Sequence, residues 1–123
     1  DISSKQSYNP AYQTGRRRFE KDRFIFRQHE KGDQAFIIQN GQVEIFKESP
    51  KGLVSLRVLE KGAMFGEMAL IDDQPRMASA KAVNSHVDLL VINQQIFKKK
   101  LANADPFTRG LINILAKTAR NND

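Results

Sequence analysis

Short apolar runs separated by turn residues make up most of the chain from Phe19 onward. Residues 24–26 form one such run, and residues 54–58 alternate apolar and polar side chains at the period of a strand. This spacing of short runs and turns predicts an all-β barrel or sandwich.

The clearest local signal is the dipeptide Asn40-Gly41, which apolar runs at residues 35–38 and 43–46 flank. Both of its residues tolerate positive φ, so we expect a type I′ hairpin turn there. Two more strands are expected at residues 78–83 and 87–92, on either side of Asn84-Ser85.

The pattern changes from strand to helix near the C-terminus. Asn93 can cap a short helix that runs through Lys100, and Asp105 followed by Pro106 is a favourable start for a second helix. One face of the second helix carries an apolar stripe formed by Phe107, Leu111, Ile114, Leu115 and Thr118. Such a stripe can pack on the β-core, form a dimer seam or close a pocket.

The composition fits one small domain. The chain has 123 residues, of which 40% are apolar and 28% charged, and it contains no cysteine and two histidines. Disulfides and thiolate metal sites are therefore excluded, and a histidine-rich metal cage is not expected. We predict that residues 1–15 form a leader or linker and residues 16–123 the domain, with no cofactor and no metal.

The charge balance favours an anionic partner. Twenty Lys and Arg residues stand against 14 Asp and Glu residues, which gives a formal net charge of +6. No apolar run approaches the roughly 20 residues that span a bilayer, and no secretory signal is apparent. We therefore expect a cytoplasmic protein without a membrane span.

The segment from Phe65 to Ala80 carries the candidate chemistry. Gly66 followed by Glu-Met-Ala-Leu predicts a single helical turn, whose free backbone N–H groups can bind an anion. Glu67 would repel a close phosphate and suits a ribose hydroxyl better. Nine residues later, Arg76 offers a planar fork of donors suited to a phosphate.

Phe65-Gly66-Glu67-x-Ala69-Leu70, followed by Pro75-Arg76-x-Ala78-Ser79, resembles the phosphate-binding cassette of cyclic nucleotide-binding domains. Such domains occur in catabolite activator proteins, protein kinase A regulatory subunits and cyclic-nucleotide-gated channels. The similarity extends over roughly residues 17–120. It implies a mainly β fold, an eight-stranded β-roll (a jelly roll) with a short cassette helix and two C-terminal helices, which holds a cyclic nucleotide inside the roll.

The resemblance also implies roles for individual residues. Glu67 would accept a hydrogen bond from the ribose 2′-hydroxyl, and Arg76 would pair with the exocyclic oxygens of the cyclic phosphate. Ile45 would lie against the base. Backbone donors and close contacts around the ribose and phosphate would come from Gly66, Met68, Ala69, Met77 and Ala78.

One residue and two short segments depart from the family's pattern. Met77 stands where cGMP-selective relatives usually have a threonine, which favours cAMP as the ligand. His29-Glu30 replaces a glycine turn. Asp72-Asp73-Gln74 adds acidity beside the arginine, which could tune affinity or pair with Arg76 in the empty state.

Each candidate also has a plainer interpretation. Glu67 and Arg76 could form an ordinary exposed ion pair, which contributes only about 0–1 kcal/mol. The histidines at positions 29 and 86 lack a second metal ligand at suitable spacing, so solvated or core-edge histidines are expected. The basic runs at residues 16–18 and 98–100 are better explained as solvated faces than as a nucleic-acid surface.

The leading hypothesis is a regulatory sensor module that binds cAMP or a related cyclic nucleotide and moves its C-terminal helix. Catalysis is not expected, because a nucleophile elbow, a phosphate-binding Walker loop and a supported carboxylate pair are all absent from the sequence. The rival is an interaction domain of the same fold that binds no nucleotide. A third interpretation is the sensor half of a transcription regulator. The partners to consider are an effector domain, another protein, or a second copy joined through the C-terminal helix.

Overall fold

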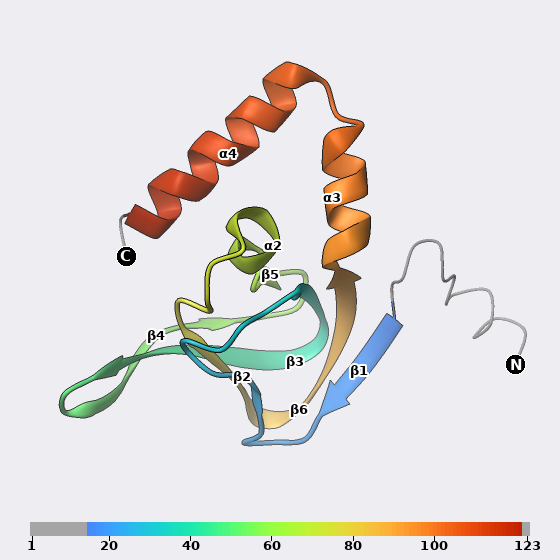
Figure 1. The fold of residues 1–123 in the computed structure, drawn as a ribbon. Helices are drawn as coiled ribbons and strands as arrows, with labels where there is room; N and C mark the ends of the chain where they lie inside the picture. Colours follow the sequence, from blue (N-terminus) through green and yellow to red (C-terminus); the bar gives the residue numbers. More distant parts are fainter. Residues whose placement is uncertain (1–14, 122–123) are drawn as a thin grey trace, which may run out of the picture.

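Six β-strands and three α-helices make up residues 15–121, the part of the chain that the computed structural model describes (Figure 1). Nearly all of the predicted leader lies outside these residues. In chain order the elements are β1 (Gly15–Phe19), β2 (Phe24–Phe26), β3 (Gln34–Ser49), β4 (Gly52–Leu59), β5 (Met64–Phe65), α2 (Met68–Asp72), β6 (Ser79–Asn93), α3 (Gln94–Ala102) and α4 (Pro106–Asn121).

Two long antiparallel strands, β3 and β6, form the spine of the sheet. The first part of β3 pairs with the last part of β6, from Gln34 opposite Asn93 to Ile38 opposite Leu89. The last part of β3 pairs with the first part of β6, down to Phe46 opposite Ser79. Strands β1 and β5 flank one half of this spine, and β2 and β4 flank the other half. The spine therefore connects two four-stranded halves of a roll.

The prediction of a hairpin turn at Asn40-Gly41 is wrong. Strand β3 runs continuously through both residues, and its register with β6 shifts there. Gly41 has φ 93°, so the positive φ that the dipeptide tolerates serves a kink instead of a chain reversal. On β6 the matching kink lies at Asn84, whose φ is 70°.

The predicted number of eight strands is wrong for the same reason. The described residues form six strands, because β3 and β6 each contribute to both halves of the roll as one bent strand. Each was expected to be two separate strands. The mainly β class and the two C-terminal helices are confirmed.

The core lies between the two halves of the roll. Alternate residues of the spine strands face inward, among them Ile38, Val43 and Leu89, which are at most 1% exposed. Phe65 from β5 completes the cluster, and its ring centroid lies 5.4 Å from that of Phe36. Because these inward-facing side chains all lie on one face of the sheet, the sheet closes into a roll to bury them.

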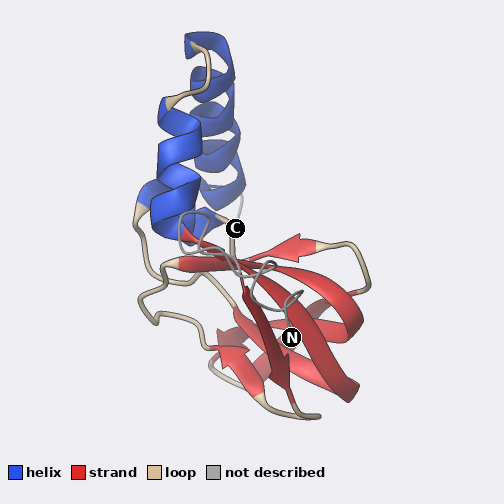
Figure 2. Ribbon diagram, turned by 90° about the vertical axis from the view of Figure 1, so that its right-hand side faces the viewer, coloured by secondary structure: helices blue, strands red, loops and turns tan. Residues whose placement is uncertain are grey.

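The C-terminal helices begin where the capping residues predict. The side chain of Asn93 accepts a hydrogen bond from Gln95 N at the start of α3, over 2.7 Å. At the start of α4, Asp105 Oδ1 accepts one from Thr108 N over 2.9 Å. Figure 1 shows α3 beside α2 and α4 above it, and Figure 2 shows the helices together on one side of the roll.

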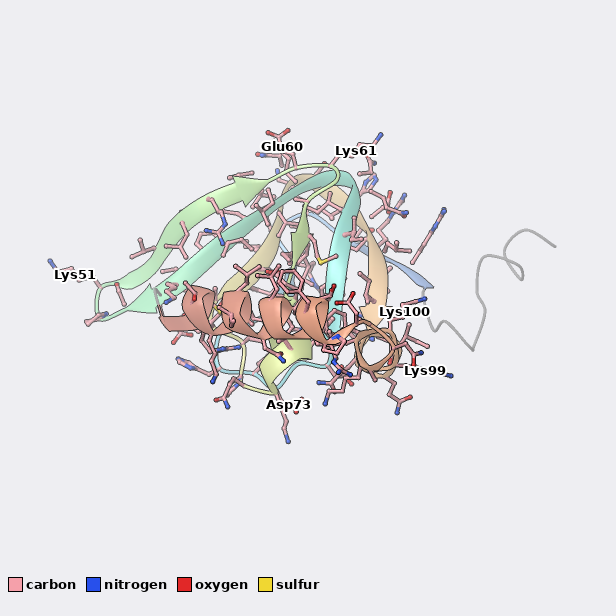
Figure 3. All side chains as sticks on the ribbon, turned by 90° about the horizontal axis from the view of Figure 1, so that it is seen from above. Lys51, Glu60, Lys61, Asp73, Lys99 and Lys100 are labelled. Carbon is pink, nitrogen blue, oxygen red and sulfur yellow. The ribbon has the colours of Figure 1, made fainter. Side chains whose placement is uncertain are left out.

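The apolar stripe of α4 is exposed. Phe107 is 77% exposed and Ile114 63%, whereas Ala116 on the same helix is buried. Near the other end of the helix, Arg120 Nη1 donates to the carbonyl oxygen of Pro75 over 3.2 Å. Viewed from above, α4 crosses the roll over α2 (Figure 3). Among the described residues, no helix is both long and apolar enough to cross a membrane.

Candidate functional site

A pocket opens between the cassette segment and the inner face of the roll. Strands β2, β3, β4 and β5, helix α2, the loop that follows it and the end of α4 all contribute to its lining. Seven of the eight predicted site residues line it, namely Ile45, Gly66, Glu67, Met68, Arg76, Met77 and Ala78. The eighth, Ala69, lies in α2, and its side chain is outside the described part of the structure.

Arg76 lines this pocket, and three contacts orient its side chain. Its Nη1 donates to the carbonyl oxygen of Gly66 over 2.9 Å, and its Nη2 donates to that of Gln34 over 2.8 Å. The guanidinium carbon lies 4.0 Å from the centroid of the Phe26 ring, a cation–π contact. Two backbone carbonyls and one aromatic face therefore fix the orientation of the fork.

Backbone hydrogen bonds tie Arg76 to the loop that follows β2. The Arg76 N–H donates to the Glu30 carbonyl over 2.8 Å, and the Arg76 carbonyl accepts from His29 N, also over 2.8 Å. His29 adopts φ 77°, the left-handed conformation that the glycine turn of the family would supply without strain. His29 therefore adopts the backbone conformation that a glycine would have at this turn, although it is not a glycine.

Two glycines make room for the guanidinium. A Cβ at Gly66 would fall 2.8 Å from Arg76 Nη1, and Gly66 also has φ 78°. Gly32, from the loop between β2 and β3, lies still closer to the same group. The side chain of Arg76 can occupy this position only because both neighbours lack a Cβ.

Arg76 is a buried cation without a carboxylate partner. It is 6% exposed, and no ion pair joins it to an acid among the described residues. Desolvation lowers the pKa of Arg76, while the nearby charges of Asp33, Glu30 and Glu67 raise it. An arginine stays protonated in proteins, so this site holds a buried positive charge that has acidic residues nearby but no carboxylate in direct contact.

Two buried polar atoms in this pocket lack a partner among the described residues. One is the donor Arg76 Nε, and the other is the acceptor Glu67 Oε2. A buried polar group without a hydrogen bond costs about 1–3 kcal/mol, so such atoms point to a ligand or water that satisfies them. The pocket thus offers a cationic donor for an anion and, separately, a carboxylate oxygen for a hydroxyl.

The plainer interpretation of Glu67 and Arg76 as an exposed ion pair does not hold. Their charged groups do not form a salt bridge, and Arg76 is buried. Glu67 occupies the N-cap position of α2, whose Leu70 is 1% exposed and anchors the helix in the interior. The cassette turn predicted after Gly66 is therefore confirmed, and it directs Glu67 into the pocket.

Asp73 does not pair with Arg76. Its carboxylate lies 3.3 Å from Lys98 Nζ of α3 instead. The histidines make only loose contacts with acids, His29 with Glu48 over 3.7 Å and His86 with Asp88 over 3.8 Å. Across the described part of the chain, no group of three or more His, Asp or Glu side chains could hold a metal ion.

Sequence reasoning missed half of the pocket lining. The additional residues are mainly apolar, with two arginines: Phe26, Leu56, Arg57, Leu59, Met64, Phe65 and Arg120. Phe26 belonged to a recognised apolar run, but nothing local indicates that it would lie under Arg76, 50 residues away in the sequence. The alternation of residues 54–58 predicted β4 correctly, although its apolar side chains stay exposed beside the pocket.

The fold and the pocket define a β-roll domain that presents a buried cation and a carboxylate to a small ligand. A family model described as a cyclic nucleotide-binding domain matches residues 16–104. The chain belongs to the cyclic nucleotide-binding domain family.

Relatives of known sequence include both kinases and transcriptional regulators. A cGMP-dependent protein kinase, egl-4 of Caenorhabditis briggsae, is 37% identical over 84 residues, which are 67% of this chain and 11% of the kinase. The anaerobic regulatory protein of Bacillus subtilis is 34% identical over 88 residues, or 70% of this chain and 37% of that protein. The chain thus spans only a small part of the length of such relatives.

Solved structures share the fold closely. The EAL enzyme Bd1971 in its cAMP-bound form has a TM-score of 0.82 at 35% identity and covers 88% of this chain, which matches 29% of that protein. Its cGMP-bound form gives the same values. The catabolite activator protein of Thermus thermophilus has a TM-score of 0.71 at 27% identity, with 98% of this chain and 53% of that one covered.

Proposed function

We propose that this chain is a regulatory domain that binds cAMP in the pocket between Arg76 and Glu67. The observation that carries the proposal is the pair of unpartnered buried atoms, Arg76 Nε and Glu67 Oε2. A cyclic nucleotide supplies what both atoms lack, because it carries one negative charge on its phosphate and one free hydroxyl on its ribose. A neutral or purely apolar ligand would leave both atoms unsatisfied.

Arg76 and Glu67 would each bind a different part of the ligand. Arg76 donates from Nε to an exocyclic phosphate oxygen, and the negative charge offsets the desolvation of the guanidinium. Glu67 accepts the 2′-hydroxyl hydrogen bond through Oε2. The glycine at position 66 lets the backbone approach the phosphate without a side chain in the way.

The apolar wall of the pocket would receive the base. Ile45 is 6% exposed and lines the pocket together with Leu59 and Met64. Met77, beside Arg76, has a thioether and no hydroxyl to donate to guanine, which favours adenine. Since solved relatives have been obtained with either cAMP or cGMP, both nucleotides belong in any test.

Regulation would follow from the position of α4. Arg120 of α4 contacts the Pro75 carbonyl next to Arg76 and lines the pocket. A nucleotide that binds one arrangement of this helix more tightly shifts the population toward it. The domain would act by binding and not by catalysis, and an effector joined to it would read the helix position.

A thermal-shift screen with cAMP, cGMP and linear 5′-AMP tests this function. A ligand at 100 times its dissociation constant stabilises the fold by about 2.7 kcal/mol. We expect cAMP to raise the melting temperature most and 5′-AMP, with its doubly charged phosphate and free 3′-hydroxyl, to raise it little. No shift with either cyclic nucleotide would favour the rival, an interaction domain that uses the exposed stripe of α4 and binds no nucleotide.

A further inference from the structure

All the sulfur-containing residues of this chain lie at one pocket. The sequence has three methionines and no cysteine. Met64, Met68 and Met77 each line the pocket that also contains Arg76 and Glu67. The oxidisable thioethers of the protein are therefore gathered at the site that we propose binds the nucleotide.

The three methionines reach the pocket from different parts of the fold. Met64 belongs to β5, and Met68 is the first residue of α2. Met77 comes from the loop between α2 and β6, directly after Arg76. A change in the chemistry of the sulfur atoms would therefore alter the wall of the pocket at a strand, at a helix and at a loop.

None of the three methionines is shielded from solvent. Met64 is 48% exposed, and both Met68 and Met77 are half-buried. The core residues next to them in the sequence differ, because Phe65 is 4% exposed and Leu70 1%. A small oxidant dissolved in water, such as hydrogen peroxide, can therefore reach the methionines before a ligand covers them.

Hydrogen peroxide converts a thioether into a sulfoxide. The sulfur attacks one peroxide oxygen, the O–O bond breaks, and the other oxygen leaves as water after a proton is transferred to it. The sulfur is oxidised by two electrons and the peroxide is reduced by two. The apolar side chain becomes a polar one that carries an S=O acceptor, and methionine sulfoxide reductases reverse the change.

A sulfoxide would alter the wall that we propose receives the base. Met64 lines the pocket together with the apolar residues Ile45 and Leu59. A sulfoxide oxygen loses its hydrogen bonds to water when a base covers it, and this loss costs free energy unless another donor replaces the water. In the protein without ligand the oxygen stays hydrated. Oxidation should therefore weaken binding more than it weakens the fold.

We propose that Met64, Met68 and Met77 form a site of reversible oxidation by peroxide, and that their oxidation lowers the affinity of the pocket for a cyclic nucleotide. The effect on affinity rests on the proposed function, whereas the oxidation depends only on where the methionines lie. A bound nucleotide covers the same residues, so it should also slow their oxidation.

Peptide mass spectrometry after treatment with hydrogen peroxide measures the oxidation of each methionine. We expect one added oxygen on each of the three residues, at peroxide concentrations that oxidise free methionine. Excess cAMP should slow the addition. The matched control is an equal concentration of linear 5′-AMP, which should leave the rates unchanged because it binds weakly.

Calorimetric titration of cAMP and of cGMP before and after peroxide treatment measures the effect on binding. The dissociation constant of the wild type should rise about tenfold, and a mixture of the two methionine sulfoxide reductases, one for each epimer, should restore it. The control is the triple variant Met64→Leu, Met68→Leu and Met77→Leu, whose side chains are similar in size but are not oxidised by peroxide. This variant is compared only with itself, and peroxide should not change its affinity.

Unchanged affinity in the oxidised wild type, or an equal loss in the peroxide-treated triple variant, would overturn the proposal. Methionines that stay unoxidised where free methionine reacts, or that cAMP and cGMP both fail to protect, would also overturn it. If the triple variant does not fold, recovery of wild-type affinity with the reductases decides the question. Failure of the untreated wild type to bind either cyclic nucleotide would overturn the proposed function, and the mass spectra would still decide whether the pocket is a site of oxidation.

Discussion

The guanidinium group of Arg76 lies so close to Gly32 that a Cβ at residue 32 would fall 2.2 Å from Nε. This glycine comes from the loop between β2 and β3, whereas Arg76 follows the cassette helix. The backbone of Gly32 does not require positive φ, so space alone demands a glycine. The absence of a side chain at Gly32 thus makes room for the arginine that we propose binds the ligand.

Gly32→Ala should displace the Arg76 side chain and weaken cAMP binding at least tenfold, because the buried guanidinium has no room to retreat without breaking its carbonyl contacts. Calorimetric titration measures this change. The matched control is Gly110→Ala, where a Cβ meets nothing within 4 Å and α4 should gain about 1 kcal/mol of stability. Equal affinity in wild type and Gly32→Ala would show that the packing of Arg76 against Gly32 does not matter for binding.

The role of Glu67 can be isolated with a ligand that lacks the 2′-hydroxyl. In the wild type, 2′-deoxy-cAMP should bind about ten- to a hundredfold more weakly than cAMP, because a hydrogen bond to a buried charged group is worth about 1.5–3 kcal/mol. In Glu67→Ala the two ligands should bind alike. A preference for cAMP that survives in Glu67→Ala would place the 2′-hydroxyl elsewhere.

His29 holds a left-handed backbone that a glycine would adopt without strain. His29→Gly should therefore stabilise the fold by about 0.5–1 kcal/mol, since relief of strain exceeds the added entropy of the unfolded chain. Urea denaturation measures the gain. Asn84→Gly is the control, because asparagine already tolerates its φ of 70° and should gain less. A loss of stability in His29→Gly would mean that its contact with Glu48 outweighs the strain.

The free energy of unfolding should fall as the pH is lowered. Three aspartates have pKa values below the usual 3.8. A hydrogen bond from Arg18 lowers the pKa of Asp88, and hydrogen bonds from Lys98 and Gln94 lower that of Asp73. The backbone N–H of Thr108 lowers the pKa of Asp105 by donating to its carboxylate. The folded state then binds fewer protons than the unfolded chain, so these contributions are complete above about pH 5 and are lost as the pH falls through the folded pKa values.

Urea denaturation at pH values from about 6 down to about 3 measures this loss of unfolding free energy. Asp88→Asn and Arg18→Gln should each flatten the dependence, because they remove opposite partners of one ion pair whose N–O distance is 2.7 Å. If both variants lose stability with acid as steeply as the wild type, the Arg18–Asp88 pair does not contribute to the acid response.

Local sequence signals predicted the helix starts and the cassette turn. Asn93 and Asp105 satisfy backbone N–H groups within three residues of themselves, so their effect does not depend on the rest of the fold. Glu67 and Arg76 were found because the cassette concentrates both in one short segment. Such contacts are visible in a sequence because they are close in the chain.

The kink at Asn40-Gly41 could not be predicted in this way. Positive φ at Gly41 is compatible with either a reversal or a kink, and the choice depends on pairing with β6 at Val83 and Asp88, more than 40 residues later. The positions of Phe26 and Gly32 beneath Arg76 depend on the same long-range closure of the roll. Pairing between distant strands therefore decides both the strand count and half of the pocket.

Calorimetric titration of cAMP into wild type and Arg76→Lys tests whether one buried arginine anchors a cyclic nucleotide. Lysine keeps the positive charge but loses the fork that reaches Gly66, Gln34 and the ligand at once. We expect the wild type to bind one cAMP per chain and Arg76→Lys, still folded by its NMR spectrum, to bind at least tenfold more weakly. Equal binding by both proteins would contradict this role of Arg76.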